Sequence, residues 1–302
     1  MSDIEIIEVG PRDGLQNQSA TLSTADKLTF IARLIEAGAR RIEVASFVNP
    51  QRVPQMADAE AVLAGLRKRA DVTTIGLVLN AHGLARALRT EVQEIGVVAV
   101  ASDTFGVRNQ KQTALESVDM AQRVIRSAKA AGRRAQATIA VSFGCPFEGE
   151  VPVERVVAMA RAIAEAEPLE IALADTIGVA VPAQVTRVIK AVQSAVPGMP
   201  LRCHFHNTRN TGIANAWAAV EAGVMRLDAS AGGIGGCPFA PKATGNIATE
   251  DLAYMLSRSG LATTVDIARL AQLAPWLADR LGLPELPAMV SRAGSFPPAS
   301  AS

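Results

Sequence analysis

The chain has 302 residues, of which 49% are hydrophobic and only 4% aromatic, and its 30 basic and 29 acidic residues leave a net charge of +1. Few aromatic side chains and no long basic run argue against a nucleic-acid-binding surface. No apolar run approaches the ~18 residues of a membrane-spanning helix, and the N-terminus does not resemble a signal or transit peptide. The three cysteines cannot all pair within the chain, so we expect a reducing compartment and a cytoplasmic protein.

Short β-branched segments alternate with amphipathic helical segments along the whole chain. Capping residues such as Ser23 precede the helices, and glycines such as Gly38 and Gly132 end them. The turn residues 10–14 break the first strand, and the polar segment 102–110 is expected to be a loop. The expected strands are residues 4–9, 41–44, 73–79, 94–100, 135–141, 170–174, 201–206 and 226–230, and the expected helices are residues 24–37, 58–66, 84–88, 115–131, 152–166, 182–195, 212–222 and 248–256.

Eight strand–helix units predict an α/β fold, a parallel sheet closed into a (β/α)8 TIM barrel with additional C-terminal helices; such barrels commonly have ~250 residues. A doubly wound open sheet is the competing architecture, which is less favoured because no G-x-G-x-x-G motif follows the first strand. We expect residues 1–260 to form the catalytic barrel. Residues 261–302 are expected to be a helical extension packed on it, with one or two helices in residues 263–281 and a Pro/Ser/Ala-rich tail.

Two histidines close the seventh expected strand, in the segment Arg202-Cys203-His204-Phe205-His206. Residues i and i+2 of a strand point to the same face, so His204 and His206 are expected to lie side by side. In a barrel of this kind the chemistry lies at the C-terminal ends of the strands, which would bring these imidazoles into one mouth with other polar residues. Those that follow strands are Arg12, Asp13, Glu43, Ser46, Asp175, Thr176, Cys237 and Asn246.

One carboxylate, two imidazoles and one amide oxygen, from Asp13, His204, His206 and Asn246, would make a mixed oxygen and nitrogen ligand set. Such a set suits Mg²⁺ or Mn²⁺, with Co²⁺ or Fe²⁺ as further options. The His-x-His spacing alone is a weak signal, because two histidines in a polar core layer would explain it as well. Likewise, Asp13 before Gly14 and Asn246 after a glycine are typical turn residues.

Arg12 and Cys237 are the other reactive side chains expected at this mouth. A buried guanidinium is costly unless it is paired, so Arg12 either forms an ion pair, with Glu43 as the natural partner, or stabilises a developing oxyanion. Cys237 lies in a Gly-Gly-Cys-Pro loop, where a thiol can donate and accept protons, although free cysteines are more often inert and buried. Cys145 and Cys203 are expected to be packing residues.

Several blocks of the sequence closely resemble the 3-hydroxy-3-methylglutaryl-coenzyme A lyases, which are metal-dependent barrel enzymes related to isopropylmalate synthases. The resemblance extends in order over roughly residues 4 to 260 and is strongest in the loop around Cys237. The blocks are Glu8 to Asn17, Ile42-Glu43-x-x-Ser46-Phe47-Val48, Val53-Pro54-Gln55-Met56, Gly144 to Gly149, Asp175-Thr176-Ile177-Gly178, Gly235 to Ala240, and Gly245 to Leu252.

The resemblance implies a lyase that splits 3-hydroxy-3-methylglutaryl-CoA, or a close 3-hydroxy-3-alkyl acyl-CoA, into acetyl-CoA and acetoacetate or the corresponding 3-oxo acid, as in leucine degradation. It implies a homodimer or larger assembly. It also implies that the metal ligands are Asp13, His204, His206 and Asn246. Arg12 would stabilise the enolate, Glu43 would be a supporting carboxylate, and the thiol of Cys237 would act as an acid and base. The implied substrate contacts are Arg12, Gln16, Ser46, Asp175 and Thr176. Either Asp13 or His204 could be the base.

Departures from the family pattern leave the exact acyl group open. Asn207 and Arg209 stand where the family often has aspartate and tyrosine, Ala172 where it often has serine, and Lys242 follows a proline where a glycine is expected. Arg52, Arg108, Lys111 and Lys242 are candidates for binding the coenzyme A phosphates, although plain surface charge is the better explanation for each of them. The alternatives are a 2-isopropylmalate or homocitrate synthase, a 4-hydroxy-2-oxoacid aldolase, and a non-catalytic binding barrel; the two kinds of enzyme are not expected to carry the Gly-Gly-Cys-Pro loop.

Overall fold

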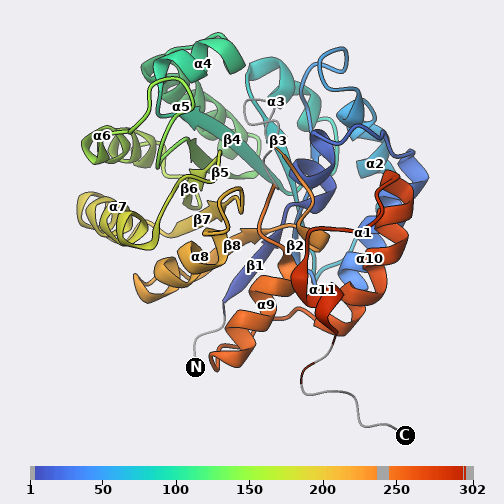
Figure 1. Ribbon diagram of the computed structural model, residues 1–302. Coiled ribbons are helices and arrows are strands. Elements are labelled where there is room, and N and C mark those ends of the chain that lie inside the picture. The colour runs from blue at the N-terminus through green and yellow to red at the C-terminus, as the bar shows by residue number, and fades with distance from the viewer. Residues whose placement is uncertain (1–3, 237–244, 295, 297–302) are drawn as a thin grey trace, which may run out of the picture.

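The computed structural model describes residues 4–236, 245–294 and 296. Within this part of the chain, eight parallel strands follow one another in sequence order around a closed barrel, as the sequence predicted (Figure 1). The first strand closes the ring by pairing with the eighth, in a register that runs from Glu5 opposite Arg226 to Glu8 opposite Ala229. The strands are β1 (Glu5–Glu8), β2 (Arg41–Ser46), β3 (Thr73–Val78), β4 (Glu94–Val100), β5 (Arg134–Ala140), β6 (Ile171–Asp175), β7 (Leu201–Phe205) and β8 (Arg226–Ala229).

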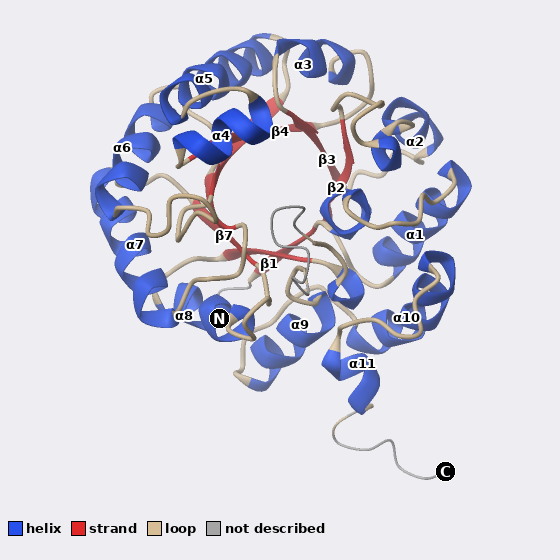
Figure 2. Ribbon diagram, turned by 45° about the horizontal axis from the view of Figure 1, so that its top comes forward, coloured by secondary structure: helices blue, strands red, loops and turns tan. Residues whose placement is uncertain are grey.

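The helices form a ring around the strands, and Figure 2 looks into the barrel through this ring. Short helical turns called η1 (Gly10–Gly14), η2 (Pro54–Met56) and η3 (Ala231–Gly233) lie in the connections. The helices are α1 (Thr24–Glu36), α2 (Ala59–Gly65), α3 (Ala81–Ala87), α4 (Asp103–Gln110), α5 (Ala114–Ala130), α6 (Val153–Ala164), α7 (Pro182–Ala195), α8 (Gly212–Glu221), α9 (Thr249–Arg258), α10 (Ile267–Leu281) and α11 (Met289–Ala293). None of the helices in the described residues is long and apolar enough to cross a membrane.

Side-chain alternation along β2 separates an apolar outer layer from a polar barrel interior. Ile42 and Val44 belong to the apolar cluster that includes Ile31 of α1. The residues that alternate with them on the strand, Arg41 and Glu43, are buried as well, but they make ion pairs. Because neighbouring strand residues face opposite sides of the sheet, the same strand supplies packing on one side and charge on the other.

A network of buried charges fills the inside of the barrel. The guanidinium of Arg41 donates to both oxygens of Glu170, at 2.8 and 3.1 Å, and pairs with Glu94. Nε of Arg202 lies 3.4 Å from Glu170 and 3.4 Å from Asp228. An unpaired charge in this position would be strongly destabilising, and in this network each charged side chain has a partner of opposite charge. At Asp228 the network reaches the C-terminal mouth of the barrel.

The prediction of a loop at residues 102–110 is wrong, because residues 103–110 of this segment form helix α4. Ser102 caps the helix by accepting a hydrogen bond from the amide of Phe105 at 3.3 Å, and Phe105 and Gly106 are buried. The segment contains a glycine and several polar residues, so its apolar periodicity is too weak to indicate a helix. In Figure 2, α4 lies inside the ring of the other helices, next to the barrel opening.

The C-terminal segment packs against the outside of the barrel next to α1 (Figure 1). The ring centroids of Trp276 in α10 and Phe30 in α1 are 6.4 Å apart, and the guanidinium of Arg33 lies 4.5 Å from the centroid of the Trp276 ring. Asp266 caps α10, which ends at Gly282 in the left-handed conformation that glycine favours. A further short helix, α11, follows in the segment that was expected to be an irregular tail. The division into a barrel unit and an extension stays a prediction.

Candidate metal centre and active site

A tight helical turn directly after β1 places Arg12 and Asp13 at the mouth of the barrel. The amides of Asp13 and Gly14 both donate to the carbonyl oxygen of Val9, at 2.8 and 3.1 Å, which makes η1 a π-type turn. Pro11 lies near its start, where a residue without an N–H group is tolerated. The five turn residues expected at this point are therefore helical, and they direct two charged side chains into the barrel opening.

The three residues Asp13, His204 and His206 converge, as the sequence predicted. Oδ2 of Asp13 lies 3.9 Å from Nε2 of His204 and 3.9 Å from Nε2 of His206. The two imidazole rings, on the same side of the end of β7, have centroids 5.1 Å apart. One ligand atom from each residue lies within 4.8 Å of the others, which is the spacing that a shared divalent cation requires.

Asn246 is the fourth expected ligand, and the backbone brings it to the same place. Its backbone forms an isolated antiparallel β-bridge with His206. Its side-chain Nδ2 donates to Oδ2 of Asp13 at 2.8 Å and to the carbonyl oxygen of Ile234 at 3.1 Å. The nitrogen of the amide therefore faces Asp13, so Asn246 would present its oxygen to a cation only after the amide turns over. Gly235 permits this close packing, because a Cβ at that position would lie 2.5 Å from Nδ2 of Asn246.

Arg12 forms the ion pair with Glu43 that was one of its two expected roles, and it forms a second ion pair with Asp13. Its Nη1 lies 2.6 Å from Oδ1 of Asp13, while Nη2 lies 2.6 Å from Oε2 of Glu43. Burial by itself raises the pKa of Asp13, but the charge of Arg12 and the two imidazoles outweigh burial and hold that pKa well below its usual range. For Glu43 the balance is reversed, and burial raises its pKa despite the contact with Arg12.

His204 has a carboxylate partner behind it that fixes the orientation of its ring. Oδ2 of Asp228, in β8, lies 3.1 Å from Nδ1 of His204, and both side chains are buried. An ionised carboxylate only accepts hydrogen bonds, so Nδ1 carries the proton and Nε2 is directed toward Asp13. Burial alone would lower the pKa of His204. The hydrogen bond to Asp228 and the charge of Asp13 raise this pKa by more than burial lowers it, so the net shift is upward. Carboxylates that orient metal-binding histidines in this way are common.

These side chains line a cavity of about 180 Å³ at the C-terminal mouth of the barrel. Two of the expected substrate contacts, Gln16 and Thr176, line it together with Arg12, and Thr176 also accepts a hydrogen bond from the amide of Val141 at 2.8 Å. Helix α4 contributes Phe105, Asn109 and Gln110, which the sequence did not single out.

The other expected substrate contacts, Ser46 and Asp175, are buried but do not line this cavity. Both carboxylate oxygens of Asp175 accept backbone amides of the loop that follows, from Val179 at 2.9 Å and from Ala180 at 3.0 Å. Asp175 thus holds that loop in shape, and a substrate role for either residue stays a prediction. Cys237 and Lys242 lie outside the described residues.

The residues that depart from the family pattern make local contacts. Nη1 of Arg209 donates to the carbonyl oxygen of Gly178 at 2.9 Å, and the side chain of Asn207 accepts from the amide of Gly212 at 3.0 Å. Ala172 is fully buried. These contacts tie neighbouring loops together, so the two polar changes, at Asn207 and Arg209, do not place a new charge in the described cavity wall.

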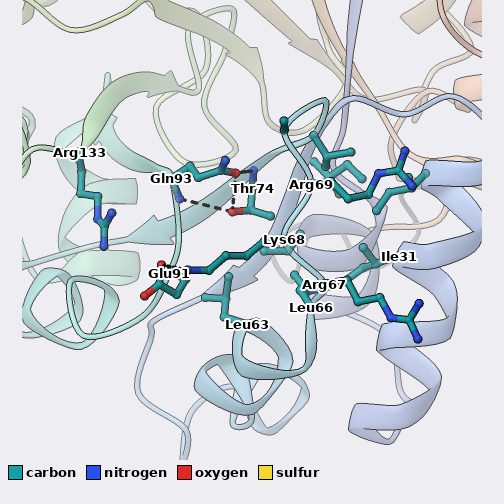
Figure 3. A pocket seen from close by; sticks show the side chains of 15 residues that line it. Ile31, Leu63, Leu66, Arg67, Lys68, Arg69, Thr74, Glu91, Gln93 and Arg133 are labelled. Atoms are coloured by element: carbon teal, nitrogen blue, oxygen red, sulfur yellow. Dashed lines mark hydrogen bonds and ion pairs between the residues drawn. The ribbon is translucent and has the colours of Figure 1, made fainter.

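A second cavity, of about 340 Å³, lies near the opposite, N-terminal ends of β3 and β4 (Figure 3). Ile31 and Leu63 line its apolar part, and several cations lie along its edge. Lys68 is paired with Glu91 at 2.9 Å, and Arg69 with Asp71 at 2.8 Å. Because chemistry in these barrels lies at the other end of the strands, we do not assign the active site to this cavity.

A closed (β/α)8 barrel with a carboxylate and two imidazoles converging at its C-terminal mouth, next to a paired arginine, is the arrangement of a barrel enzyme with a candidate metal centre. Comparison with known proteins makes this class more specific. The model of the HMGL-like family matches residues 3–276. The chain belongs to the HMGL-like family, as its sequence motifs predicted.

Relatives in this family are lyases of acyl-CoA thioesters. The chain is 40% identical to a hydroxymethylglutaryl-CoA lyase of Bacillus subtilis, over 93% of this chain and 94% of the relative. It is 41% identical to an (R)-citramalyl-CoA lyase of Chloroflexus aurantiacus, over 99% of this chain and 97% of the relative.

Solved structures agree with the sequence relatives. A lyase from Acinetobacter baumannii in complex with coenzyme A and 3-methylmalate superposes with a TM-score of 0.92 at 38% identity, covering 97% of this chain and 95% of that one. A putative aldolase from Bacteroides vulgatus is only 17% identical, with a TM-score of 0.68, and shares the fold alone. The synthase and aldolase alternatives are therefore not favoured.

Proposed function

We propose that this chain is a carbon–carbon lyase that cleaves 3-hydroxy-3-methylglutaryl-CoA, or a close 3-hydroxy-3-alkyl acyl-CoA, into acetyl-CoA and acetoacetate or the corresponding 3-oxo acid. The observation that carries the proposal is the convergence of Asp13, His204 and His206 next to the guanidinium of Arg12 in one buried mouth. Both the class of reaction and the kind of substrate follow the relatives, which are lyases of acyl-CoA thioesters.

The donor set fits a hard divalent cation. Asp13, His204 and His206 would hold it, with Asn246 as a fourth ligand, and a site with one carboxylate and no thiolate among its described members suits Mg²⁺ or Mn²⁺. When bound, such a cation supplies Lewis acidity that makes a tertiary hydroxyl group more acidic and fixes its orientation.

The chain's own residues supply the proton acceptor and the oxyanion partner. Either Asp13 or His204 would accept the hydroxyl proton. As the oxygen becomes a ketone, the C2–C3 bond breaks and its electron pair moves onto C2 and the thioester carbonyl. Arg12 is already held in place by Glu43 at 2.6 Å, so its guanidinium can stabilise the resulting enolate without reorganisation.

Protonation of the enolate at C2 completes the formation of acetyl-CoA. We assign this proton transfer to Cys237, on the Gly-Gly-Cys-Pro loop, because thiols are effective acids and bases near neutral pH. The neighbouring described residue, Gly236, lines the cavity, and its carbonyl oxygen accepts a hydrogen bond from Asn17 at 3.0 Å.

The length of the acid-bearing arm of the substrate can be determined by experiment. Methylglutaryl and citramalyl thioesters differ by one methylene in this arm and yield acetoacetate and pyruvate, respectively. Purified protein should therefore be assayed with both substrates in the presence of Mg²⁺ or Mn²⁺, with acetyl-CoA and the oxo acid measured separately. Release of acetyl-CoA with acetoacetate supports the proposed substrate, pyruvate alone would assign the shorter arm, and no acetyl-CoA from either would contradict the lyase.

The acetoacetate product would fit a role in leucine degradation. We also propose a cytoplasmic location and a homodimer or larger assembly, by similarity to the family. Size-exclusion chromatography with light scattering measures the mass in solution, and a monomer would contradict the assembly. Cell fractionation followed by immunoblotting tests the location.

A further inference from the structure

Gln110, the last residue of α4, faces the candidate active site with an amide that lacks partners. Within the described part of the chain, its Nε2 and Oε1 are both buried and neither has a hydrogen-bond partner. The side chain lines the same cavity as Arg12, Asp13 and His204. Buried polar atoms are nearly always paired, because an unpaired one loses its contact with water without replacement. Two such atoms on one side chain point to a missing ligand.

The position of Gln110 is fixed by the packing of its helix. The amide of Thr104 donates to Oε1 of Glu148 at 2.6 Å, and the amide of Ala114, beyond the end of the helix, donates to Oδ1 of Asp103 at 2.8 Å. Both contacts are made by the first turn of α4, and the second one ties the segment that follows Gln110 back to the start of the helix. The amide of Gln112 also donates to the carbonyl oxygen of Gly106 at 3.4 Å, so the chain on either side of Gln110 is held against α4.

The wall that α4 forms is an edge where the cavity meets solvent. Asn109, next to Gln110, lines the same cavity but is exposed. Helix α4 follows β4, which lies on the opposite side of the closed ring from β8, the strand that carries Asp228. A substrate whose acyl group is held at Asp13 and the two histidines would therefore extend its long arm outward past this wall.

We propose that Gln110 binds the pantetheine arm of the acyl-CoA substrate at the amide nearest the thioester, and this inference rests on the proposed function. Oε1 would accept the N–H of that amide, and Nε2 would donate to a carbonyl oxygen of the arm. The acyl group is a poorer match, because a carboxylate offers no donor to Oε1 and the tertiary hydroxyl is used at the metal centre. Amides are the groups of this substrate that offer both a donor and an acceptor.

The test combines truncation of the substrate with substitution of Gln110. The same acyl group is presented as the coenzyme A thioester, as the N-acetylcysteamine thioester, which keeps the nearest amide, and as the S-butyl thioester, which has none. Gln110→Leu removes the amide with little change of shape, and Gln110→Met is the second variant. Gln112→Leu is the matched control, because Oε1 of Gln112 is also buried and unpaired among the described residues but does not line the cavity.

The expected result for Gln110→Leu is a loss of about tenfold in kcat/KM, mainly through KM, for both amide-containing thioesters and no loss for the S-butyl thioester. Gln112→Leu should match the wild type with all three. Equal losses with all three substrates, or none with any, would overturn the proposal. Thermal unfolding checks the variants, and Gln110→Leu is not expected to be less stable than the wild type, since it replaces an unpaired buried amide with an apolar group.

Failure of the proposed function can be distinguished from failure of this inference. A wild-type protein that releases no acetyl-CoA contradicts the lyase and leaves Gln110 testable by calorimetric titration with acetyl-CoA. In that titration, Gln110→Leu should weaken binding about tenfold and Gln112→Leu should not change it. Equal affinity in all three proteins would overturn the proposed contact.

Discussion

Oδ2 of Asp228 lies 3.1 Å from Nδ1 of His204, and on the other side of the same ring Nε2 faces Oδ2 of Asp13 at 3.9 Å. One imidazole thus connects the buried charge network of the barrel interior to the candidate metal centre. Asp228 is itself held by Arg202, 3.4 Å away, and this contact and the one with His204 lower the pKa of Asp228 although burial opposes them. The carboxylate is therefore ionised and ready to orient His204.

Asp228→Asn should weaken metal binding by about 10- to 100-fold, because the imidazole loses the carboxylate that fixes its tautomer and direction. Titration with Mn²⁺, followed by electron paramagnetic resonance of the free ion, measures this affinity directly. Asp71→Asn, a change at an exposed aspartate far from the mouth, is the control. Unchanged affinity in Asp228→Asn would mean that Asp228 only balances the charge of Arg202.

Arg12→Lys and Arg12→Met should fold normally but lower kcat at least ~100-fold, the scale expected for the loss of an oxyanion partner. Lysine keeps the charge but cannot contact Asp13 and Glu43 with a planar fork. Steady-state kinetics with the preferred thioester, together with circular dichroism, separate turnover from folding. Near-normal turnover in either variant would reduce Arg12 to a structural member of an ion pair.

Glu8 should make stability depend on pH. It accepts hydrogen bonds from the amides of Gly10 and Ala231 and from Thr249, yet burial outweighs them and raises the pKa of Glu8 from 4.5 to about 7. Because the folded state holds this proton more tightly than the unfolded state, the stabilisation is fully present below pH 4.5 and is lost as the pH rises through 7.

Glu8→Gln should remove this dependence, because glutamine stays neutral. The free energy of unfolding of the variant minus that of the wild type should increase between pH 5 and pH 8 by up to about 3 kcal/mol, the value of the pKa shift. Urea denaturation at several pH values measures the difference. If the difference is flat across this range, the carboxylate of Glu8 titrates normally in the folded protein.

Arg41→Met should destabilise the fold by about 3–5 kcal/mol, because it leaves Glu94 and Glu170 buried without their main partner. Lys68→Met is the control, since its ion pair with Glu91 is exposed and such pairs contribute little. Urea denaturation of both variants compares the two effects. Equal stability of Arg41→Met and the wild type would show that the network tolerates an unbalanced charge.

The regular parts of the fold and of the site could be predicted from sequence. The βα alternation indicated the barrel, and the two-residue period of β7 indicated that His204 and His206 share a face. Helix α4 was missed because its polar, glycine-containing segment has little apolar periodicity, and Gln110 was missed with it. The same two-residue period could have identified Asp228, since this residue faces inward on β8, the strand next to that of His204. Its role was not predicted, because the sequence around a single acidic residue in a strand does not indicate which side chain it contacts.

The dependence of the proposed reaction on a divalent cation is tested most directly by assaying 3-hydroxy-3-methylglutaryl-CoA cleavage after metal removal. The purified protein is treated with EDTA, desalted, and assayed for acetyl-CoA and acetoacetate before and after addition of Mg²⁺ or Mn²⁺. The expected result is no activity in the chelated protein and recovery on addition of either ion. Full activity in the chelated protein, shown by elemental analysis to be free of metal, would contradict the assignment of Asp13, His204 and His206 as a catalytic metal centre.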